Sequence, residues 1–251
     1  MLDIITKKEY YSFWEDQIAD QKNHSLKGIQ DAFVLSILRK ERGKRIAEIG
    51  GGNSRILPKI KDYNECYNIE KFEGMGLGPT TIIDIPGVII IKSYIGEFDN
   101  MIKNNFFDVL FSISVVEHIE TDELDLFFKD CHRILKTGGY MVHAIDIYLD
   151  EKVRRFKKPD YYLYIKDRKS DFKYLHPAID TERIEYYRQA VEKAGFLWHS
   201  DPSITKGLVF STKFASNSDL TMAGWNKVSP LLRAIRENMQ SVSIKMIAKK
   251  I

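Results

Sequence analysis

The sequence predicts an α/β fold in which seven mostly parallel strands form a doubly wound sheet with helices on both faces. Three observations predict this fold. Short apolar segments alternate with segments of helical periodicity, which is the order that builds a parallel sheet. Several of the apolar segments have almost no polar positions, as in strands that are buried on both faces. The first of them ends in a glycine run, which is typical of a tight turn between a strand and a helix.

The expected strands follow one another along most of the chain. They occupy residues 45–49, 66–69, 88–91, 107–113, 140–145, 196–199 and 208–212. The segment 88–91 consists entirely of β-branched apolar residues, which favour strands over helices.

Helices are expected between these strands and after the last of them. The segment 56–60 has helical spacing directly after the glycine run, and 123–135 carries apolar residues at a helical period before a glycine pair. A further helix is predicted over 181–194, because a threonine stands at its start and a glycine directly after it. From Pro230 onward, the apolar spacing predicts an amphipathic helix packed on the body of the protein.

The chain divides into one enlarged domain with additions at both ends. Residues 1–43 are expected to form an N-terminal helical cap. Residues 44–215 form the core, with a basic and aromatic insertion at 148–178, and residues 216–251 form a C-terminal helical extension packed on it. A chain of 251 residues can bury a core of this size.

The composition is that of an ordinary globular protein and excludes several classes. With 44% hydrophobic and 29% charged residues, neither a disordered nor a fibrous architecture is indicated. No apolar run approaches the roughly 20 residues that span a bilayer, so we expect a cytoplasmic protein without membrane insertion. A net charge of +3 is small for a surface-wide nucleic-acid footprint. Cys66 and Cys131 lack metal or redox spacing, are expected to be buried, and no ligand cluster predicts a metal site.

A glycine turn and two acids predict a nucleoside-type ligand at one edge of the sheet. The run Gly50-Gly51-Gly52 follows a strand whose end carries Glu48. Glycine permits positive φ and a close approach of backbone N–H groups to a ligand, while the carboxylate can organise the loop or meet a cationic ligand. Glu70 follows the second strand about 20 residues beyond the first glycine, where an acid can bind the two hydroxyls of a ribose.

Two other nucleotide-binding motifs do not fit this glycine run. The G-x-G-x-x-G fingerprint of nicotinamide dinucleotide sites would require glycine at Arg55. A Walker A loop is excluded because no Gly-Lys-Ser/Thr sequence ends the run.

Three segments, in this order, resemble the motifs of class I methyltransferases, whose sheet is Rossmann-like. Glu48-x-Gly50-x-Gly52 resembles their first motif, 107–119 resembles their fourth-strand motif, and 135–139 resembles the segment before their fifth strand. The resemblance covers residues 44–147. It departs from the family pattern where Ser54 stands for the usual third glycine and where no aspartate directly follows the third strand.

This resemblance implies S-adenosyl-L-methionine as the cofactor. The residues expected to contact it are Glu48, Gly50, Gly52, Asn53, Glu70, Lys71, Ser93, Tyr94, Ser114, Val115 and His118. The first motif would hold its methionine end, Glu70 its ribose, and Ser93 with Tyr94 the edge of its adenine.

The acceptor is expected beyond the carboxyl ends of the fourth and fifth strands, because ligands of doubly wound sheets bind at that edge. His118 and Asp146 are the candidate catalytic residues, since transfer to a hydroxyl requires one base. His118 is alternatively part of the cofactor wall. His143, inside the fifth strand, is interpreted as a packed core residue.

A basic segment offers a way to recognise the acceptor. Residues 152–173 carry nine Lys or Arg residues against three Asp, interleaved with five aromatic residues. One interpretation is a solvated charged face, and the other is a lid that binds an anionic acceptor. An N-terminal aromatic cluster consists of Tyr10, Tyr11, Phe13 and Trp14. It either covers the cofactor site as a cap or packs helices together. The residues expected to bind the acceptor are Tyr11, Trp14, Arg155, Tyr162 and Tyr164.

The sequence therefore predicts an S-adenosylmethionine-dependent methyltransferase acting on a small, anionic acceptor that is phosphorylated or sugar-linked. Bacterial surface-polysaccharide or secondary-metabolite biosynthesis is the expected setting. Two alternatives stay open: a tRNA or rRNA methyltransferase with the same fold, and a non-catalytic protein that retains the cofactor pocket. The oligomeric state is also open.

Overall fold

The computed structural model describes residues 1–5, 7–19, 26–74, 78–148, 181–199 and 241–251. The predicted basic insertion and the strand predicted at 208–212 lie outside these ranges. Within them, no helix is both long and apolar enough to cross a membrane.

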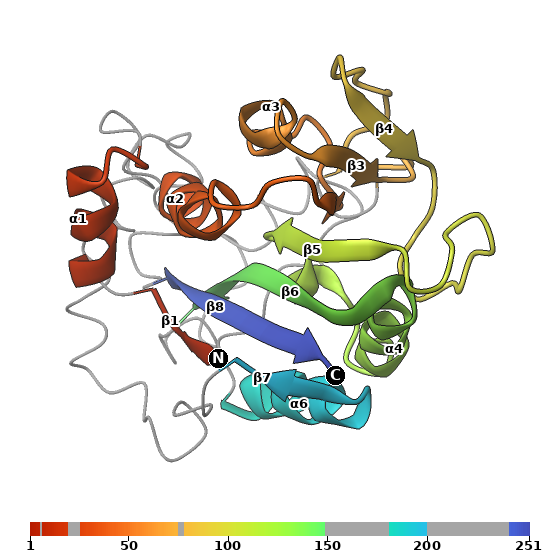
Figure 1. The fold of residues 1–251 in the computed structure, drawn as a ribbon. Coiled ribbons are helices and arrows are strands. Elements are labelled where there is room, and N and C mark those ends of the chain that lie inside the picture. The colour runs from red at the N-terminus through yellow and green to blue at the C-terminus, as the bar shows by residue number, and fades with distance from the viewer. Residues whose placement is uncertain (6, 20–25, 75–77, 149–180, 200–240) are drawn as a thin grey trace, which may run out of the picture.

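A single mixed sheet of eight strands organises the described residues (Figure 1). The strands are β1 (Leu2–Ile4), β2 (Arg45–Ile49), β3 (Glu65–Ile69), β4 (Val88–Ile91), β5 (Phe107–Ile113), β6 (Leu135–Tyr148), β7 (Phe196–Trp198) and β8 (Ser241–Lys250). Their order is β1-β8-β6-β5-β2-β3-β4, and β7 also pairs with β8. The pairs among β2 to β6 are parallel, whereas every pair that includes β8 is antiparallel. The predicted mostly parallel sheet is confirmed.

Helices cover both faces of this sheet, as predicted (Figure 1). They are α1 (Lys7–Glu15), α2 (Leu26–Leu38), α3 (Leu57–Ile60), the short 3₁₀ helix η1 (Val116–His118), α4 (Leu124–Ile134) and α6 (Thr181–Lys193). Neighbouring residues of one strand enter opposite layers: Ile46 joins the core beneath α2 and α3, and Ala47 joins the core beneath α4 and α6. This alternation follows from the two-residue period of a strand and explains why β2 is apolar at almost every position.

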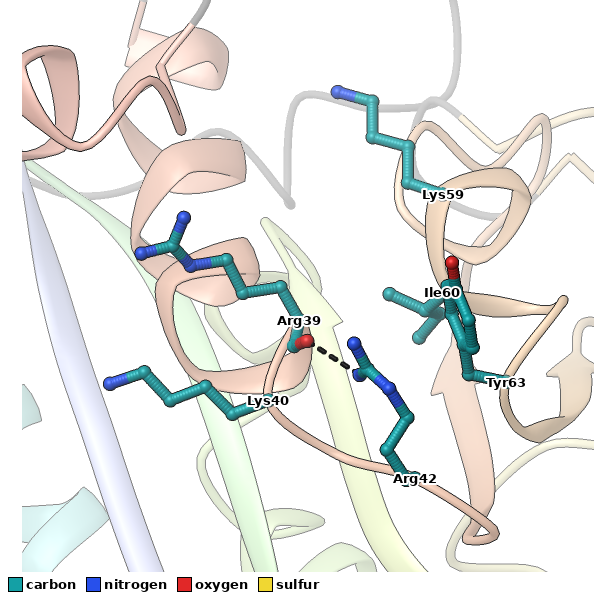
Figure 2. A pocket seen from close by; sticks show the side chains of 6 residues that line it. All are labelled: Arg39, Lys40, Arg42, Lys59, Ile60 and Tyr63. Atoms are coloured by element: carbon teal, nitrogen blue, oxygen red, sulfur yellow. Dashed lines mark hydrogen bonds between the residues drawn. The ribbon is translucent and has the colours of Figure 1, made fainter.

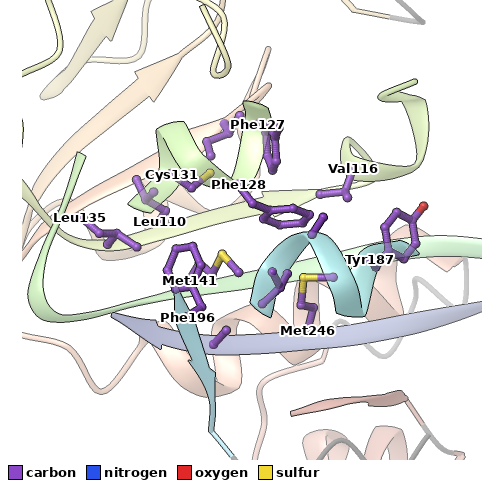
Figure 3. Close-up of a cluster of buried hydrophobic side chains, with 14 of the residues drawn as sticks. Leu110, Val116, Phe127, Phe128, Cys131, Leu135, Met141, Tyr187, Phe196 and Met246 are labelled. Carbon is purple, nitrogen blue, oxygen red and sulfur yellow. The ribbon is translucent and has the colours of Figure 1, made fainter. Parts of the chain in front are cut away.

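The layer beneath α4 and α6 is shown in Figure 3. Phe128 of α4 and Tyr187 of α6 pack with Met141 of β6 and Met246 of β8, and all four are almost fully buried. Complete burial of a side chain of this size stabilises the fold by roughly 1.5–3 kcal/mol. This packing fixes α6 and β8 on the sheet although they come from the last third of the chain.

The helix predicted from Pro230 is wrong where the structure describes that segment, because residues 241–250 form β8. Ile244, Met246 and Ala248 are fully buried and alternate with the residues of the opposite face, a two-residue period that fits a strand. β8 lies between β6 on one side and β1 and β7 on the other, so both of its edges are paired. The remainder of the expected C-terminal extension, residues 216–240, lies outside the described ranges.

The expected N-terminal cap also contributes a strand. Residues 2–4 form β1 and pair with β8, while α1 and α2 supply the helices expected in this segment. The buried ammonium group of Lys245 on β8 forms ion pairs with Asp3 and Glu9, which fastens the N-terminal segment to the C-terminal strand.

Candidate functional site

The glycine turn lies at the carboxyl end of β2 and packs directly against the segment that follows β5. Gly50 has a φ of +66°, and a Cβ atom there would lie 2.7 Å from a methyl carbon of Val115. The Gly50 N–H donates to the Ile69 carbonyl at the end of β3 (2.9 Å). A side chain at position 50 is therefore opposed by both the backbone conformation and the available space. The structure thus brings together Gly50 and Val115, which the sequence assigned to one cofactor site.

Two buried acceptors lie beneath this turn. Glu48 is 4% exposed and Asn68 is fully buried, and among the described residues Glu48 Oε2 and Asn68 Oδ1 have no hydrogen-bond partner. The Asn68 amide donates to the Gly52 carbonyl (2.9 Å). A Cβ atom at Gly51 would lie 2.6 Å from Asn68 Oδ1 and 2.9 Å from Glu48 Cδ. Asn68 was not predicted from the sequence, although its position on β3, two residues before Glu70, was a usable signal.

Burial governs the protonation of Glu48. Removal from water raises the pKa of its carboxyl to about 8, and the hydrogen bond from Ser54 and the charge of Arg55 oppose this rise. The carboxyl is therefore largely neutral at pH 7 and would ionise when a cation approached it.

The rest of the turn is tied to neighbouring helices. Ser54 Oγ accepts from the backbone N–H groups of Ile56 (3.2 Å) and Leu57 (2.9 Å), at the start of α3. Arg55 forms a two-bond pair with Asp31 on α2 (2.7 and 2.8 Å). Ser54 thus has a capping role where the family pattern has glycine, and Arg55 fixes the turn against α2.

A second group of predicted residues gathers at the ends of β3 and β4. Glu70 is 9% exposed and accepts from the Phe72 N–H (3.2 Å). Lys71 Nζ lies 4.6 Å above the Tyr94 ring and 3.0 Å from a Glu97 carboxylate oxygen. Burial, followed by nearby carboxylates, raises the pKa of Tyr94 to about 12, so the phenol stays protonated. Ser93, beside it, is 2% exposed.

Asp146, at the end of β6, belongs to a polar network rather than standing alone. Its Oδ1 atom accepts from Gln30 Nε2 (2.5 Å) and from the Ser114 hydroxyl (2.7 Å), and Lys27 Nζ lies 3.6 Å from Oδ2. Gln30 is fully buried and also donates to Ser243 on β8 (3.1 Å). The network joins α2 to β6, β8 and the residue that follows β5, and no sequence pattern indicated Gln30.

The helix η1 carries a buried carboxyl that the sequence had not assigned to any role. Glu117 is 5% exposed, and neither of its carboxyl oxygens has a hydrogen-bond partner among the described residues. Burial first, and then the negative charge of Asp146, raises the pKa of Glu117 well above its ordinary value. His118 follows it on η1 and is half-buried, so the two predicted catalytic residues, His118 and Asp146, border the same carboxyl edge.

His143 is a core residue, in agreement with its interpretation from sequence. It is fully buried, its Nδ1 lies 2.7 Å from Ser112 Oγ, and Phe127 and Phe128 pack near its ring. Burial lowers its pKa to about 3, so the ring is neutral at physiological pH.

The residues predicted to bind the acceptor are only partly described. Tyr11 and Trp14 lie on α1, and Trp14 is half-buried against the core layer beneath α2. Arg155, Tyr162 and Tyr164 lie outside the described ranges. In the part of the chain that the structure describes, no three metal-ligating side chains cluster, and both cysteines are free and buried.

Comparison with known proteins finds a family match over the segment that carries this region. Residues 47–143 match the family model for a methyltransferase domain. Phosphoethanolamine N-methyltransferase 1 of Zea mays is 25% identical over 151 residues, which are 56% of this chain and 30% of that protein. This chain therefore spans less than a third of the length of that curated relative.

Solved structures share the architecture at low sequence identity. The cyclopropane synthase MmaA2 of Mycobacterium tuberculosis has a TM-score of 0.58 at 16% identity, covering 92% of this chain and 87% of that one. Phosphoethanolamine N-methyltransferase 2 of Haemonchus contortus has a TM-score of 0.54 at 14% identity, covering 87% and 51%. Geranyl diphosphate C-methyltransferase of Streptomyces coelicolor has a TM-score of 0.53 at 12% identity, covering 87% and 77%. At these identities the likeness establishes the fold.

Proposed function

We propose that this chain, whose residues 47–143 match the family model for a methyltransferase domain, is a class I methyltransferase that transfers a methyl group from S-adenosyl-L-methionine to a small acceptor. The observation that carries the proposal is the carboxyl edge of the sheet. There the glycine turn lies above Glu48 Oε2 and Asn68 Oδ1, which have no hydrogen-bond partner in the described part of the chain, and Glu70 directly follows the next strand. Crevices at this edge are where doubly wound sheets bind their ligands.

The residues present fit this cofactor. Its methionine end carries an ammonium group, which matches the buried carboxyl of Glu48 and the free amide oxygen of Asn68. The turn from Gly50 to Asn53 would hold that end, and the carboxylate of Glu70 would accept the ribose hydroxyls. Lys71, Ser93 and Tyr94, gathered beyond β3 and β4, would border the adenine.

The cofactor would supply a methyl group bound to a sulfonium sulfur. When this methyl group is transferred, the sulfur leaves as a neutral thioether, which is a good leaving group. The chain therefore chiefly has to align the acceptor, exclude water and receive a proton from it. Ser114, Val115 and His118 would line the reactive side, with His118 as the base that takes the proton. Asp146, whose Oδ1 accepts two hydrogen bonds, acts on the reaction by fixing Ser114.

For the acceptor we propose a small anionic molecule, phosphorylated or sugar-linked. The similar proteins named above include two phosphoethanolamine N-methyltransferases and a geranyl diphosphate C-methyltransferase, so phosphate-bearing acceptors recur among proteins of this fold. Tyr11, Trp14, Arg155, Tyr162 and Tyr164 are the proposed acceptor contacts. A cytoplasmic enzyme of surface-polysaccharide or secondary-metabolite biosynthesis is part of the same proposal.

Calorimetric titration with S-adenosylhomocysteine, with NADH as the alternative ligand, tests the cofactor assignment. We expect micromolar binding of the thioether, at least tenfold weaker binding to Glu70→Ala, and no binding of NADH. Glu65→Ala is the matched control, because Glu65 begins the strand that Glu70 follows, is exposed, and lies at the opposite edge of the sheet. Preference for NADH, or equal losses in both variants, would refute the assignment.

A further inference from the structure

A basic pocket lies at the amino edge of the parallel strands, the edge opposite the glycine turn. It has a volume of about 560 Å³ and is lined by Arg39, Lys40, Arg42, Lys59, Ile60 and Tyr63 (Figure 2). The first three of these residues follow α2 and precede β2, and the others come from α3 and the segment leading to β3. The glycine turn follows β2 at its other end, so this pocket and the proposed cofactor site lie at opposite ends of the same strand.

Four cations line this one opening, and little negative charge balances them. Arg39 lies 3.7 Å from an Asp16 carboxylate oxygen, which is a loose and exposed ion pair. Lys40 and Lys59 donate backbone hydrogen bonds to Ile37 and Ile56, but among the described residues neither side-chain ammonium group has a hydrogen bond or ion pair. The Glu41 carboxylate accepts from the Tyr140 hydroxyl (2.9 Å) and is not a pocket-lining group. The protein's net charge of only +3 makes this concentration a local feature.

Helix capping accounts for part of the cluster. Cations are favourable near a helix C-terminus, and Arg42 donates to the backbone carbonyls of Arg39 and Glu41 (both 2.7 Å) just beyond α2. That role does not extend to Lys59, which belongs to a different helix and lines the pocket from the other side (Figure 2). Mutual repulsion of unpaired cations around one opening is relieved when an anion binds between them.

Tyr63 supplies a flat wall beside the cations. Its side chain is 58% exposed, and the Arg42 guanidinium lies 4.2 Å from the centre of its ring. The stacking restrains Arg42 as a planar donor, the geometry that suits phosphate oxygens. A phenol ring next to fixed cations also suits a ligand that joins a planar group to phosphates.

We propose that this basic pocket binds a small molecule carrying two or more linked phosphate groups, at a site separate from the carboxyl edge. Its volume lies within the range of small-ligand sites. Four positive charges exceed what a single phosphate can balance, whereas a diphosphate or triphosphate matches them. The four cations line a single pocket and not an extended groove, which favours a small ligand over a polynucleotide.

Calorimetric titration with sodium pyrophosphate at constant ionic strength tests the proposal on the full chain. We expect micromolar affinity for the wild-type protein and at least tenfold weaker affinity for Lys40→Gln/Lys59→Gln. The matched control is Lys103→Gln/Lys129→Gln, which removes two exposed charges outside the pocket and should bind like the wild type. Binding of S-adenosylhomocysteine should be the same in all three proteins, so this result is independent of the proposed function.

Any one of several outcomes would overturn the proposal. They are no pyrophosphate binding below millimolar concentration, equal losses in the two double variants, and tighter binding of single-stranded oligonucleotides whose affinity grows with their length. Inorganic sulfate, titrated in parallel, should bind at least tenfold more weakly than pyrophosphate. Equal affinity for the two anions would also contradict a site built for linked phosphates.

Discussion

The side-chain amide of Gln30 donates a 2.5 Å hydrogen bond to Asp146 and so connects α2 to the end of β6. The same amide group accepts from the Ser114 hydroxyl (2.9 Å) and donates to Ser243 (3.1 Å). Buried polar networks of this kind stabilise only when every member is satisfied. One glutamine therefore holds together three strand ends that surround the proposed reaction site.

Replacement of Gln30 by alanine should destabilise the protein. The change removes the donor to the buried Ser243 hydroxyl and one of the two donors to Asp146 Oδ1, and such loss costs about 1–3 kcal/mol of the free energy of unfolding. Denaturant titration of the wild type and the variant measures this difference in the free energy of unfolding. Gln189→Ala is the control, because that exposed amide bonds to Glu185 on its own helix and to no other side chain in the described ranges, so its removal should cost less than about 0.5 kcal/mol. Equal effects of the two changes would show that the network contributes nothing.

A matched pair of glycine substitutions separates backbone strain from crowding at the turn. Gly50 and Gly43 have nearly the same φ, +66° and +64°. A Cβ atom at Gly50 would lie 2.7 Å from a Val115 methyl carbon, whereas a Cβ atom at Gly43 would have no neighbouring atom within 4 Å. We expect Gly50→Ala to abolish measurable cofactor binding and Gly43→Ala to leave it within about twofold of wild type. Val115→Ala should restore part of the binding to Gly50→Ala. If Gly50→Ala binds normally, the turn is not the cofactor cradle.

The raised pKa of Glu117 predicts how stability depends on pH. The folded protein retains a proton that the unfolded chain releases near pH 4.5, so this contribution is present below pH 4.5 and is lost as pH rises through the folded-state pKa. Glu117→Gln cannot ionise, and its free energy of unfolding should fall less steeply from pH 5 to pH 8. Glu120→Gln, an exposed neighbour, is the control. Parallel curves for wild type and Glu117→Gln would contradict a buried neutral carboxyl.

Glu48 predicts a pH dependence of cofactor binding. Its pKa of about 8 means that the carboxyl must lose a proton before it can pair with the cofactor's ammonium group. Affinity for S-adenosylhomocysteine should therefore rise between pH 6 and pH 8, by up to about tenfold per pH unit, and level off above pH 8. Titration of Glu48→Gln should give a flat profile. A flat profile for the wild type would remove Glu48 from the methionine end of the site.

The sequence predicted the parallel half of the sheet well because most of its strands are buried on both faces, and the edge strand β4 consists entirely of β-branched apolar residues. The bounds of β2, β4 and β5 agree with the apolar runs that predicted them. β8 was missed because apolar residues on both of its faces also fit a helical spacing. The alternation of buried and exposed positions is hidden in the sequence, because polar residues such as Ser243 and Lys245 are also buried. Those residues have tertiary partners on α1, α2, β1 and β6, which no local pattern reveals.

The candidate site was predictable where chemistry follows a strand end, as for Glu48, Gly50 and Glu70. The site residues that α2 contributes could not be predicted from the sequence. Gln30 and Asp31 lie on a helix whose other residues are largely apolar, and their contacts with Asp146 and Arg55 depend on how α2 crosses the sheet. Sequence spacing contains no information about that crossing.

A crystal structure of the protein with S-adenosylhomocysteine tests the central claim most directly. The account predicts density at the carboxyl edge, with the amino acid end against the Gly50–Gly52 turn, the ribose hydroxyls on the Glu70 carboxylate, and the sulfur facing His118. Density elsewhere on the protein, or an empty carboxyl edge at saturating ligand concentration, would contradict it.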